Sequence, residues 1–527
     1  MTLKKKEILS LVLVLGLFIL GSVAAAMVYF RLDMTSTGSF SISPVTKDIL
    51  RGLEDELVLT YYVSKELKSN SPIPQALEDL LNEYTAASGG RVRLVVVDPA
   101  ETNQIQEVQK LGLQAIPLRI TSNNTFTQVE CYTGLTVEFR DKKQVIPVLD
   151  QPETLEYQLT NLIRQVLGVE KTSFGLLVGN SQYTMARGFQ YLSKVLGETK
   201  TLVEIPRGSP IEQSLKAVVV LGDQTLNDLD VFYLDQYLMK GGKLFLGIDG
   251  VDVSIESQDP QTAIKPSVDT PLKKWLASFG VNVERSLVLD STGSMLQNLG
   301  GGMTIPTAYP AWVSILVNNT NSTHPVTTRF GGMSLLWGSP LSVESKEGIK
   351  TDNLLWSTPK SWLMLDQFTL DPEMAKFSLQ MGGAGTQKSY TMGISLQGVF
   401  SSYYNQNPKP AGLSDEVIAK SPESRIIVLG DSDFATDLIG QTVTAQGNLS
   451  FLDNAVDYLA QDEALLSIKS RPQRDRSLNA LKAEDGSASW AYWSLILINA
   501  IIVPLGLVTY GIIRGMRRRL REKGEKA

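Results

Sequence analysis

The pattern of hydrophobic and polar positions predicts alternating strands and helices along most of this chain. Residues 57–63 form a run rich in β-branched and aromatic side chains, which is typical of a strand. Residues 73–87 place apolar side chains three or four positions apart, the spacing of one helix face. A second strand at 92–97 and a second helix at 103–111 follow. This order predicts an α/β domain over about residues 37–150.

The end of this first domain is predicted as a hairpin of strands 116–120 and 135–139. The resulting order of elements resembles a thioredoxin-like fold, and Ile116-Pro117 falls where that fold carries a cis-proline. The redox motif Cys-x-x-Cys is absent, so thiol oxidoreductase chemistry is excluded. Residues 153–167 predict an amphipathic helix, which we interpret as part of a connector spanning residues 151–171.

A second series of strands and helices runs from residue 172 to residue 476. Its strands are short, uninterrupted apolar runs, which are typical of a parallel sheet covered on both faces. Residues 291–412 are instead rich in Gly, Ser, Thr, Asn and Trp, and they predict a β-rich insertion. The predicted strands are 174–179, 201–205, 217–222, 243–248, 281–289 and 425–430, and the predicted helices are 188–196, 228–239, 271–279 and 449–459.

Two uncharged apolar segments bracket these domains, at residues 8–30 and 490–513. Each is longer than the roughly 20 residues that a helix needs to cross a bilayer, so we expect two transmembrane helices. A cleaved signal peptide is the alternative for the first segment, because its start is basic and Ala24-Ala25-Ala26 resembles a cleavage site. The length of the segment favours an uncleaved anchor.

Basic residues flank both apolar segments on their outer sides. Lysines lie within residues 1–7, and a basic tail of arginines and lysines occupies residues 514–527. Since cytoplasmic flanks carry the excess of Lys and Arg, we expect both termini in the cytoplasm and the body outside it. A polar linker at 477–489 leads into the second segment. The predicted location is the bacterial inner (cytoplasmic) membrane, with the body periplasmic or extracellular.

The charge and the scarcity of cysteine and histidine exclude several classes of function. The net charge is −6 although both ends are basic, so the body is acidic and poorly suited to nucleic acid. The single cysteine, Cys131, excludes an intrachain disulfide. A Ser or Cys nucleophile would need the single histidine, His324, as its base, and no G-x-S-x-G motif is present.

Two motifs suggest a binding site, one for a metal ion and one for phosphate, and each can also be explained by a role in the fold. Asp431 and Asp433 follow a predicted strand, where a carboxylate pair can bind a metal ion, or can order the turn and cap the next helix. Gly241-Gly242-Lys243 resembles part of a phosphate loop, but it ends a predicted helix and opens a strand, the reverse of the required order. A helix end is the favoured interpretation there.

Tryptophans gather in the predicted insertion. They could form a stacking platform for a carbohydrate or peptide, or they could fill the core of that region. The residues concerned are Trp312, Trp337, Trp356 and Trp362.

A set of motifs, in order along the chain, is similar to the GldG-type auxiliary components of bacterial ABC transport systems, named from the gliding-motility ABC transporter. The motifs are the Ser41–Leu50 segment after the first apolar segment, the strand Leu57–Lys65, the turn Gly241-Gly242-Lys243-Leu244, the run Gly430–Phe434, Asn448, the helix Phe451–Leu459, and Ile468–Arg471. The resemblance covers essentially the whole chain.

The resemblance implies that the second domain has a flavodoxin-like, class I glutamine-amidotransferase-like fold without its nucleophile and histidine. It implies a non-enzymatic auxiliary subunit with no catalytic residue, cofactor or metal, associated with the bilayer, a permease and a separately encoded ABC ATPase. The sequence cannot supply the ATPase itself, because it has no Walker A motif. An anchored carbohydrate- or peptide-binding protein and a membrane-bound hydrolase using Asp431 or Asp433 are the alternatives.

Overall fold

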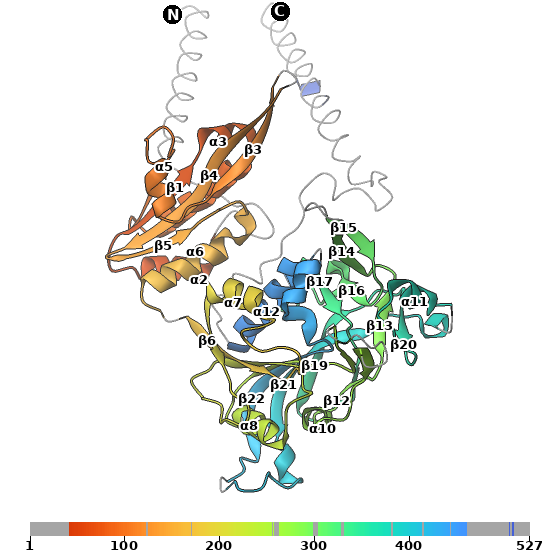
Figure 1. Cartoon of the computed structure of the whole chain (residues 1–527). Coiled ribbons are helices and arrows are strands. Elements are labelled where there is room, and N and C mark those ends of the chain that lie inside the picture. The colour runs from red at the N-terminus through yellow and green to blue at the C-terminus, as the bar shows by residue number, and fades with distance from the viewer. Residues whose placement is uncertain are drawn as a thin grey trace, which may run out of the picture. The chain divides into compact units, whose positions relative to one another are not determined.

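The computed structural model describes residues 42–460, except 123–124, 170, 256, 258–262, 299–303, 328–330, 381–382, 414–415 and 443, together with Leu505, Thr509 and Tyr510. The chain divides into two compact units, residues 1–471 and 472–527. The described part of the first unit contains an N-terminal domain and a larger second domain (Figure 1).

The N-terminal domain is built on one five-stranded sheet with the order β2-β1-β4-β3, in which β5 also pairs with β4. Strand β1 runs parallel to β2 and antiparallel to β4. The strands are β1 (Leu57–Val63), β2 (Val92–Val97), β3 (Ala115–Ser122), β4 (Thr125–Phe139) and β5 (Lys142–Ile146). The helices are α2 (Pro44–Arg51), α3 (Lys65–Asn70), α4 (Ile73–Ala87), α5 (Ile105–Lys110) and α6 (Pro152–Val166).

Buried and partly buried side chains alternate along β1, and the buried ones form part of the core of this domain. Every second residue of β1 is buried, as expected for a strand with one face against the core. Tyr61 of β1, Leu81 of α4 and Leu159 of α6 belong to one buried cluster. The core therefore forms from helices that the sequence separates by up to about a hundred residues.

The second domain is built on a seven-stranded sheet with the order β19-β21-β22-β9-β8-β6-β7. The five strands from β22 to β7 are parallel, and β21 and β19 extend the sheet in antiparallel pairing. The strands are β6 (Thr172–Val178), β7 (Lys200–Glu204), β8 (Ala217–Leu221), β9 (Leu244–Gly247), β19 (Ile349–Trp356), β21 (Thr391–Ser401) and β22 (Lys420–Leu429).

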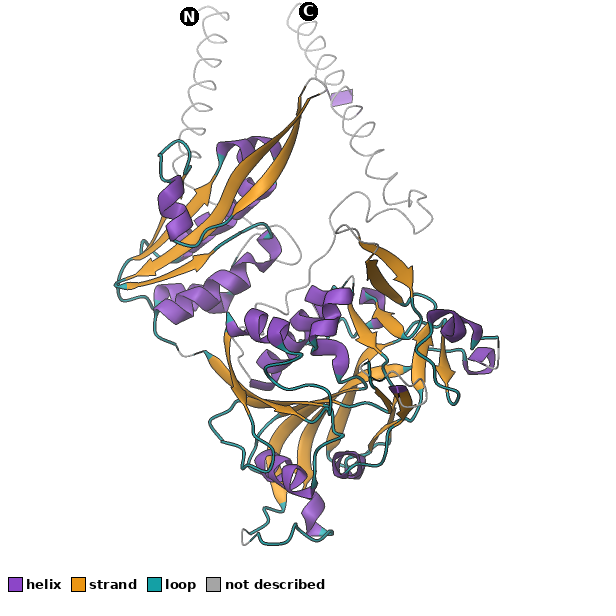
Figure 2. Cartoon of the chain, viewed as in Figure 1, coloured by secondary structure: helices purple, strands orange, loops and turns teal. Residues whose placement is uncertain are grey.

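Helices cover both faces of this sheet (Figures 1 and 2). Helices α7 (Gln190–Gly197) and α12 (Ala445–Ala460) pack on one face, and α8 (Asp228–Met239) and α10 (Pro271–Ser278) pack on the other. Successive residues of β8 belong to opposite clusters, Val219 to the first and Val220 to the second. The uninterrupted apolar run of β8 is therefore explained by burial on both sides.

Short paired strands and short helices complete the second domain. The antiparallel pairs are β10 (Val251–Val253) with β11 (Ile264–Pro266), β12 (Val281–Val283) with β18 (Leu341–Val343), β13 (Leu287–Asp290) with β20 (Ser361–Met364), β14 (Ser294–Asn298) with β15 (Thr304–Ala308), and β16 (Trp312–Ile315) with β17 (Met333–Leu336). The short helices are α11 (Pro372–Phe377), η1 (Val317–Asn319), η2 (Gly383–Thr386), η3 (Tyr403–Asn405), η4 (Asp433–Ala435) and η5 (Asp437–Gln441).

The structure corrects the predicted fold class. No helix among the described residues is both long and apolar enough to cross a membrane, so the structure does not support the predicted fold class with two transmembrane helices bracketing the body, and the described chain is a mixed α/β protein. Apart from Leu505, Thr509 and Tyr510, the segments 8–30 and 490–513 lie outside the described residues. The same is true of 1–7, 477–489 and 514–527.

Two further expectations changed in detail. The described residues contain no cis peptide bond, so the cis-proline expected at Ile116-Pro117 is wrong. Within residues 291–412, which we interpreted as an insertion, β19 and β21 join the seven-stranded sheet next to β22. The remaining strands of that region form only two-stranded pairs.

Candidate functional site

Acidic side chains gather at the carboxyl ends of the parallel strands in the second domain. Asp223 follows β8, Asp249 follows β9, and Asp431 and Asp433 follow β22. All four residues are buried. Open α/β sheets bind their ligands at this edge, so the two acids that the sequence singled out lie where a ligand site is expected.

Asp431 holds the turn after β22 in place. Its Oδ1 accepts hydrogen bonds from the backbone N–H groups of Asp433 at 2.7 Å and Phe434 at 3.1 Å. Its Oδ2 accepts a third from the backbone N–H of Leu336 at 2.6 Å. The carboxylate therefore fixes the start of η4 and ties it to the end of β17, which is the turn-ordering role proposed as the alternative to metal binding.

Asp433 differs from its neighbour, because its Oδ1 has no hydrogen-bond partner among the described residues and its side chain is 5% exposed. Burial, together with the charges of Asp249 and Asp431, raises the pKa of Asp433 well above its ordinary value. Burial also raises the pKa of Asp249 to about 6, although hydrogen bonds from Ser432 oppose that shift. Burial and the charge of Asp249 also raise the pKa of Asp431 well above its ordinary value, although its three backbone hydrogen bonds oppose that shift. Because Asp433 lacks such hydrogen bonds at Oδ1, it is the carboxyl group of this pair best suited to hold a proton.

The chain itself fills the crevice at this edge of the sheet. The backbone N–H of Ser339 donates to the carbonyl oxygen of Gly430 at 2.6 Å, and the backbone N–H of Gly250 donates to Ser339 Oγ at 3.0 Å. A Cβ atom added at Gly430 would lie 1.9 Å from the carbonyl oxygen of Ser339. This close approach leaves no room for a substrate between Ser339 and Asp431.

The described residues offer no metal site. Among them, no group of three or more His, Cys, Asp or Glu side chains is arranged to hold a metal ion. Asp249 and Asp431 are instead occupied by backbone N–H groups and by the hydroxyl of Ser432. The geometry therefore gives no support to the hydrolase alternative that relied on Asp431 or Asp433.

The Gly241-Gly242-Lys243 turn and Cys131 also have structural roles. Gly241 follows helix α8 with a φ of +89°, a left-handed conformation that suits glycine, and Lys243 precedes β9. The helix-end interpretation of Gly241-Gly242-Lys243 is therefore confirmed. Cys131 lies on β4 and is buried, and burial, with smaller effects of Glu66 and Asp98, raises the pKa of its thiol.

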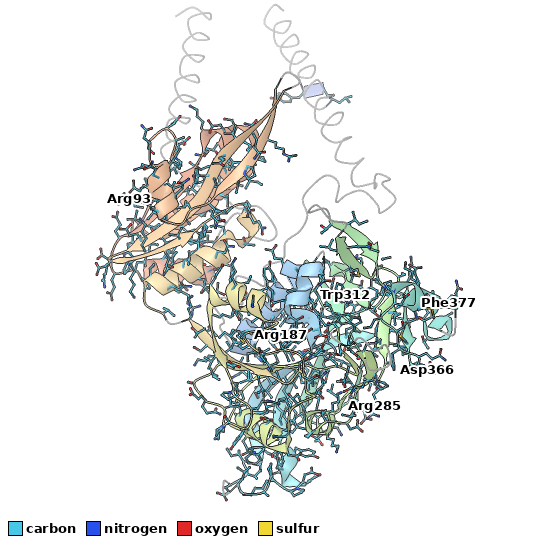
Figure 3. The ribbon with its side chains drawn as sticks, in the orientation of Figure 1. Arg93, Arg187, Arg285, Trp312, Asp366 and Phe377 are labelled. Carbon is cyan, nitrogen blue, oxygen red and sulfur yellow. The ribbon has the colours of Figure 1, made fainter. Side chains whose placement is uncertain are left out.

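The tryptophans of the predicted insertion fill the core of that region. Trp312, which is labelled in Figure 3, is 2% exposed, and Trp337 is 6% exposed. Their rings meet edge to face at a centroid distance of 5.6 Å. Trp337 Nε1 donates to the hydroxyl of Tyr309 at 2.9 Å. Trp362 is also buried, whereas Trp356 is half-buried. With three of the four rings enclosed, a stacking platform for ligand has no geometric support.

His324, another candidate from the sequence, borders an open groove in the described part of the chain. His324 is 8% exposed, and its ring meets the ring of Tyr458 at a centroid distance of 4.7 Å. His324 Nδ1 accepts a hydrogen bond from the backbone N–H of Val326 at 3.3 Å. The adjoining groove has a volume of about 280 Å³ and is lined only by polar residues, Pro325 and Tyr458.

A buried ion cluster that the sequence analysis missed lies between β7 and α12. The ammonium group of Lys200, whose side chain is 2% exposed, pairs with Asp453 and lies 2.9 Å from Asp457 Oδ1. The hydroxyl of Tyr157 lies 3.2 Å from one oxygen of each carboxylate, so the two aspartates share its single donated proton. Although burial alone would lower the pKa of Lys200, the two aspartates raise it above its ordinary value.

Comparison with known proteins identifies the class to which the chain belongs. Residues 171–461 match the family described as an ABC-type uncharacterized transport system, and the match covers more than half of the chain. The chain belongs to this family of auxiliary components of ABC transport. The resemblance found in the sequence is confirmed at this level, whereas the narrower GldG type is not. Residues 36–138 match a second family, a domain of unknown function.

Individual similar proteins give no further information about function beyond the family match. An uncharacterized protein of Borreliella burgdorferi is 24% identical over 529 residues, which cover 98% of this chain and 99% of that protein. Among solved structures, the mmIFT52 N-terminal domain aligns over 54% of this chain and 99% of its own length, at 12% identity and a TM-score of 0.31. A TM-score this low supports no conclusion.

Proposed function

We propose that this protein is a non-enzymatic auxiliary subunit of a bacterial ABC transport complex of the GldG type. In this role it binds a permease and works with a separately encoded ABC ATPase. The match of residues 171–461 to the ABC transport family is the observation that carries the proposal. The absence of a Walker A motif in the sequence is consistent with an ATPase on another chain.

The chemistry of the buried side chains supports a scaffold rather than an enzyme. Asp431 is occupied by three backbone N–H groups, and Ser339 fills the crevice beside it. Asp431 thereby stabilises the edge of the sheet. We propose accordingly that the complex works at the bacterial inner (cytoplasmic) membrane, where a permease lies, and that the described domains contribute contacts and no reaction.

Co-purification tests the proposed association. The chain, tagged and expressed at its native level, is isolated from membranes under mild conditions, and its partners are identified by mass spectrometry. We expect a permease and an ABC ATPase in fixed proportion to the tagged chain and absent from an untagged strain. Recovery of the chain alone, under conditions that keep other ABC complexes intact, would count against the proposal.

A variant tests the non-enzymatic role separately. Asp433→Asn removes the carboxyl group that is most suited to proton transfer, while it keeps the size of the side chain. We expect this variant to co-purify and to support growth or transport like the natural chain. Loss of transport by a variant that still assembles would show that the acid takes part in chemistry.

A further inference from the structure

Three neighbouring strands of the seven-stranded sheet form the floor of the groove beside His324. Lys350 on β19 pairs in register with Gln397 on β21, and Gln397 pairs in register with Arg425 on β22. Residues paired directly across strands project from the same face, roughly 5 Å apart. The three side chains therefore form one polar row, and Asp352, two residues after Lys350, lies on the same face.

The walls of the groove come from segments distant in the sequence. Asn321, Thr323 and His324 belong to the loop after η1, and Tyr458 belongs to the last turn of α12. The volume of about 280 Å³ lies near the lower end of the range for small-molecule sites, roughly 300–1,000 Å³. Since the lining is polar on every side, the groove suits a small polar ligand rather than an apolar one.

The charges that line the groove favour an anion. Lys350 and Arg425 are cationic, and Asp352 is the one acid among the lining residues. Burial lowers the pKa of His324 to about 4, so its imidazole is neutral at pH 7. The lining thus carries one positive charge in excess. Glu423 lies outside the lining and accepts a hydrogen bond from Gln397 Nε2 at 2.7 Å.

Arg425 is held in a fixed orientation before any ligand arrives. Its guanidinium lies over the ring of Tyr458 at 4.4 Å, and Nη1 donates to the carbonyl oxygen of Tyr458 at 3.0 Å. Those are the contacts that the described residues make with the group, although a guanidinium has five N–H donors. Stacked guanidinium groups match the planar oxygen pairs of carboxylate and phosphate.

We propose that the groove between the Asn321–Pro325 loop, the β19-β21-β22 row and Tyr458 binds a small molecule through its carboxylate or phosphate group. Arg425 receives two oxygens of this group, and Lys350 turns from Asp352 to share the negative charge. Lys350 Nζ lies 2.7 Å from Asp352 Oδ2, and the lysine side chain is exposed while that of Asp352 is partly exposed, so this pair can rearrange at little cost. The site is independent of the docking proposed above.

The single histidine gives this proposal a direct probe. The full-length chain, labelled with ¹³C at its histidine ring, is titrated with inorganic phosphate and separately with acetate, at constant ionic strength set by sodium chloride. We expect one or both anions to shift the His324 resonance in a saturable way. Saturation should also raise the pKa of His324, because an anion beside the imidazole favours its charged form.

Two substitutions decide whether the shift reports binding in the groove. Lys350→Gln should weaken the apparent Kd about tenfold, because it removes a charge-assisted contact. Lys360→Gln removes an exposed lysine outside the lining and should leave the Kd unchanged. If phosphate alone saturates the shift, the ligand group is a phosphate, and if acetate alone does so, it is a carboxylate. The proposal fails if neither anion gives saturable shifts, if chloride gives the same shifts, or if Lys350→Gln binds like the natural chain.

Discussion

Two aspartates in one turn show how the surroundings of a residue decide its role. Asp431 accepts three backbone hydrogen bonds, and all three stabilise its charged form. Asp433 is also buried, but its Oδ1 accepts no hydrogen bond from the described residues. The residue types are identical, so the sequence alone assigned them one common role. The difference comes from the backbone N–H groups that the fold directs toward one carboxylate only.

Asp433→Asn should stabilise the protein at neutral pH by about 1–3 kcal/mol, because the amide removes the cost of enclosing an ionisable carboxyl group beside Asp249 and Asp431. The pKa of Asp433 is raised in the folded state, so its contribution to stability is fully present below the ordinary Asp pKa and is lost as the pH rises. The gain from Asn should therefore shrink toward pH 4. Urea unfolding between pH 4 and pH 8 measures both effects.

The neighbouring substitution is the matched control. Asp431→Asn replaces an acceptor of three N–H groups with a side chain that has one acceptor oxygen, so it should destabilise the protein at every pH in that range. If both variants changed stability in the same direction, the assignment of the proton to Asp433 would be wrong.

At the scale of elements, the sequence predicted individual strands and helices, because the periodicity that marks them is local. The strand 57–63 and the helices 73–87 and 228–239 were predicted with the bounds that the structure has. Pairing was harder to predict, because it depends on residues far apart. The joining of β19 and β21 to β22 has no local signal, since an edge strand and an insertion strand share the same alternation.

Long-range side-chain contacts were beyond prediction for the same reason. Lys200 appears in the sequence as an ordinary strand residue, yet it meets Asp453 and Asp457 more than 250 positions later. The groove at His324 likewise draws its lining from a loop, three strands and a helix. The rarity of histidine and the carboxylate pair after a strand did direct attention to His324 and Asp431, but the sequence could not show which of them borders open space.

The close contact between Gly430, which follows β22, and Ser339, which lies between β17 and β18, can be tested by substitution. Gly430→Ala should destabilise the second domain by about 1–3 kcal/mol or more, because its Cβ would meet the backbone of Ser339, which cannot turn aside as a side chain can. Gly440→Ala is the control, since a Cβ there meets nothing within 4 Å. Thermal unfolding compares the two variants. Equal stabilities would mean that the crevice at the sheet edge is open.

At the scale of the whole molecule, the hydrophobic clusters divide along the chain. One large cluster takes its members from residues 42–167 only, and includes Tyr61 and Leu159. The two clusters on the faces of the seven-stranded sheet take theirs from residues 174–459. Each group of elements therefore has a core of its own, as expected of separate domains.

This division predicts that residues 42–168 fold alone. Leu155, Leu159 and Ile163 of α6 are fully buried within the same cluster as β1, so the fragment must include that helix to complete its core. We expect one cooperative urea transition, with a stability of about 5–15 kcal/mol that is ordinary for a domain. A matched fragment that stops at residue 150 lacks α6 and should unfold without cooperativity. If the longer fragment also failed to unfold cooperatively, its core would depend on residues beyond 168, and the two groups of elements would form a single folding unit.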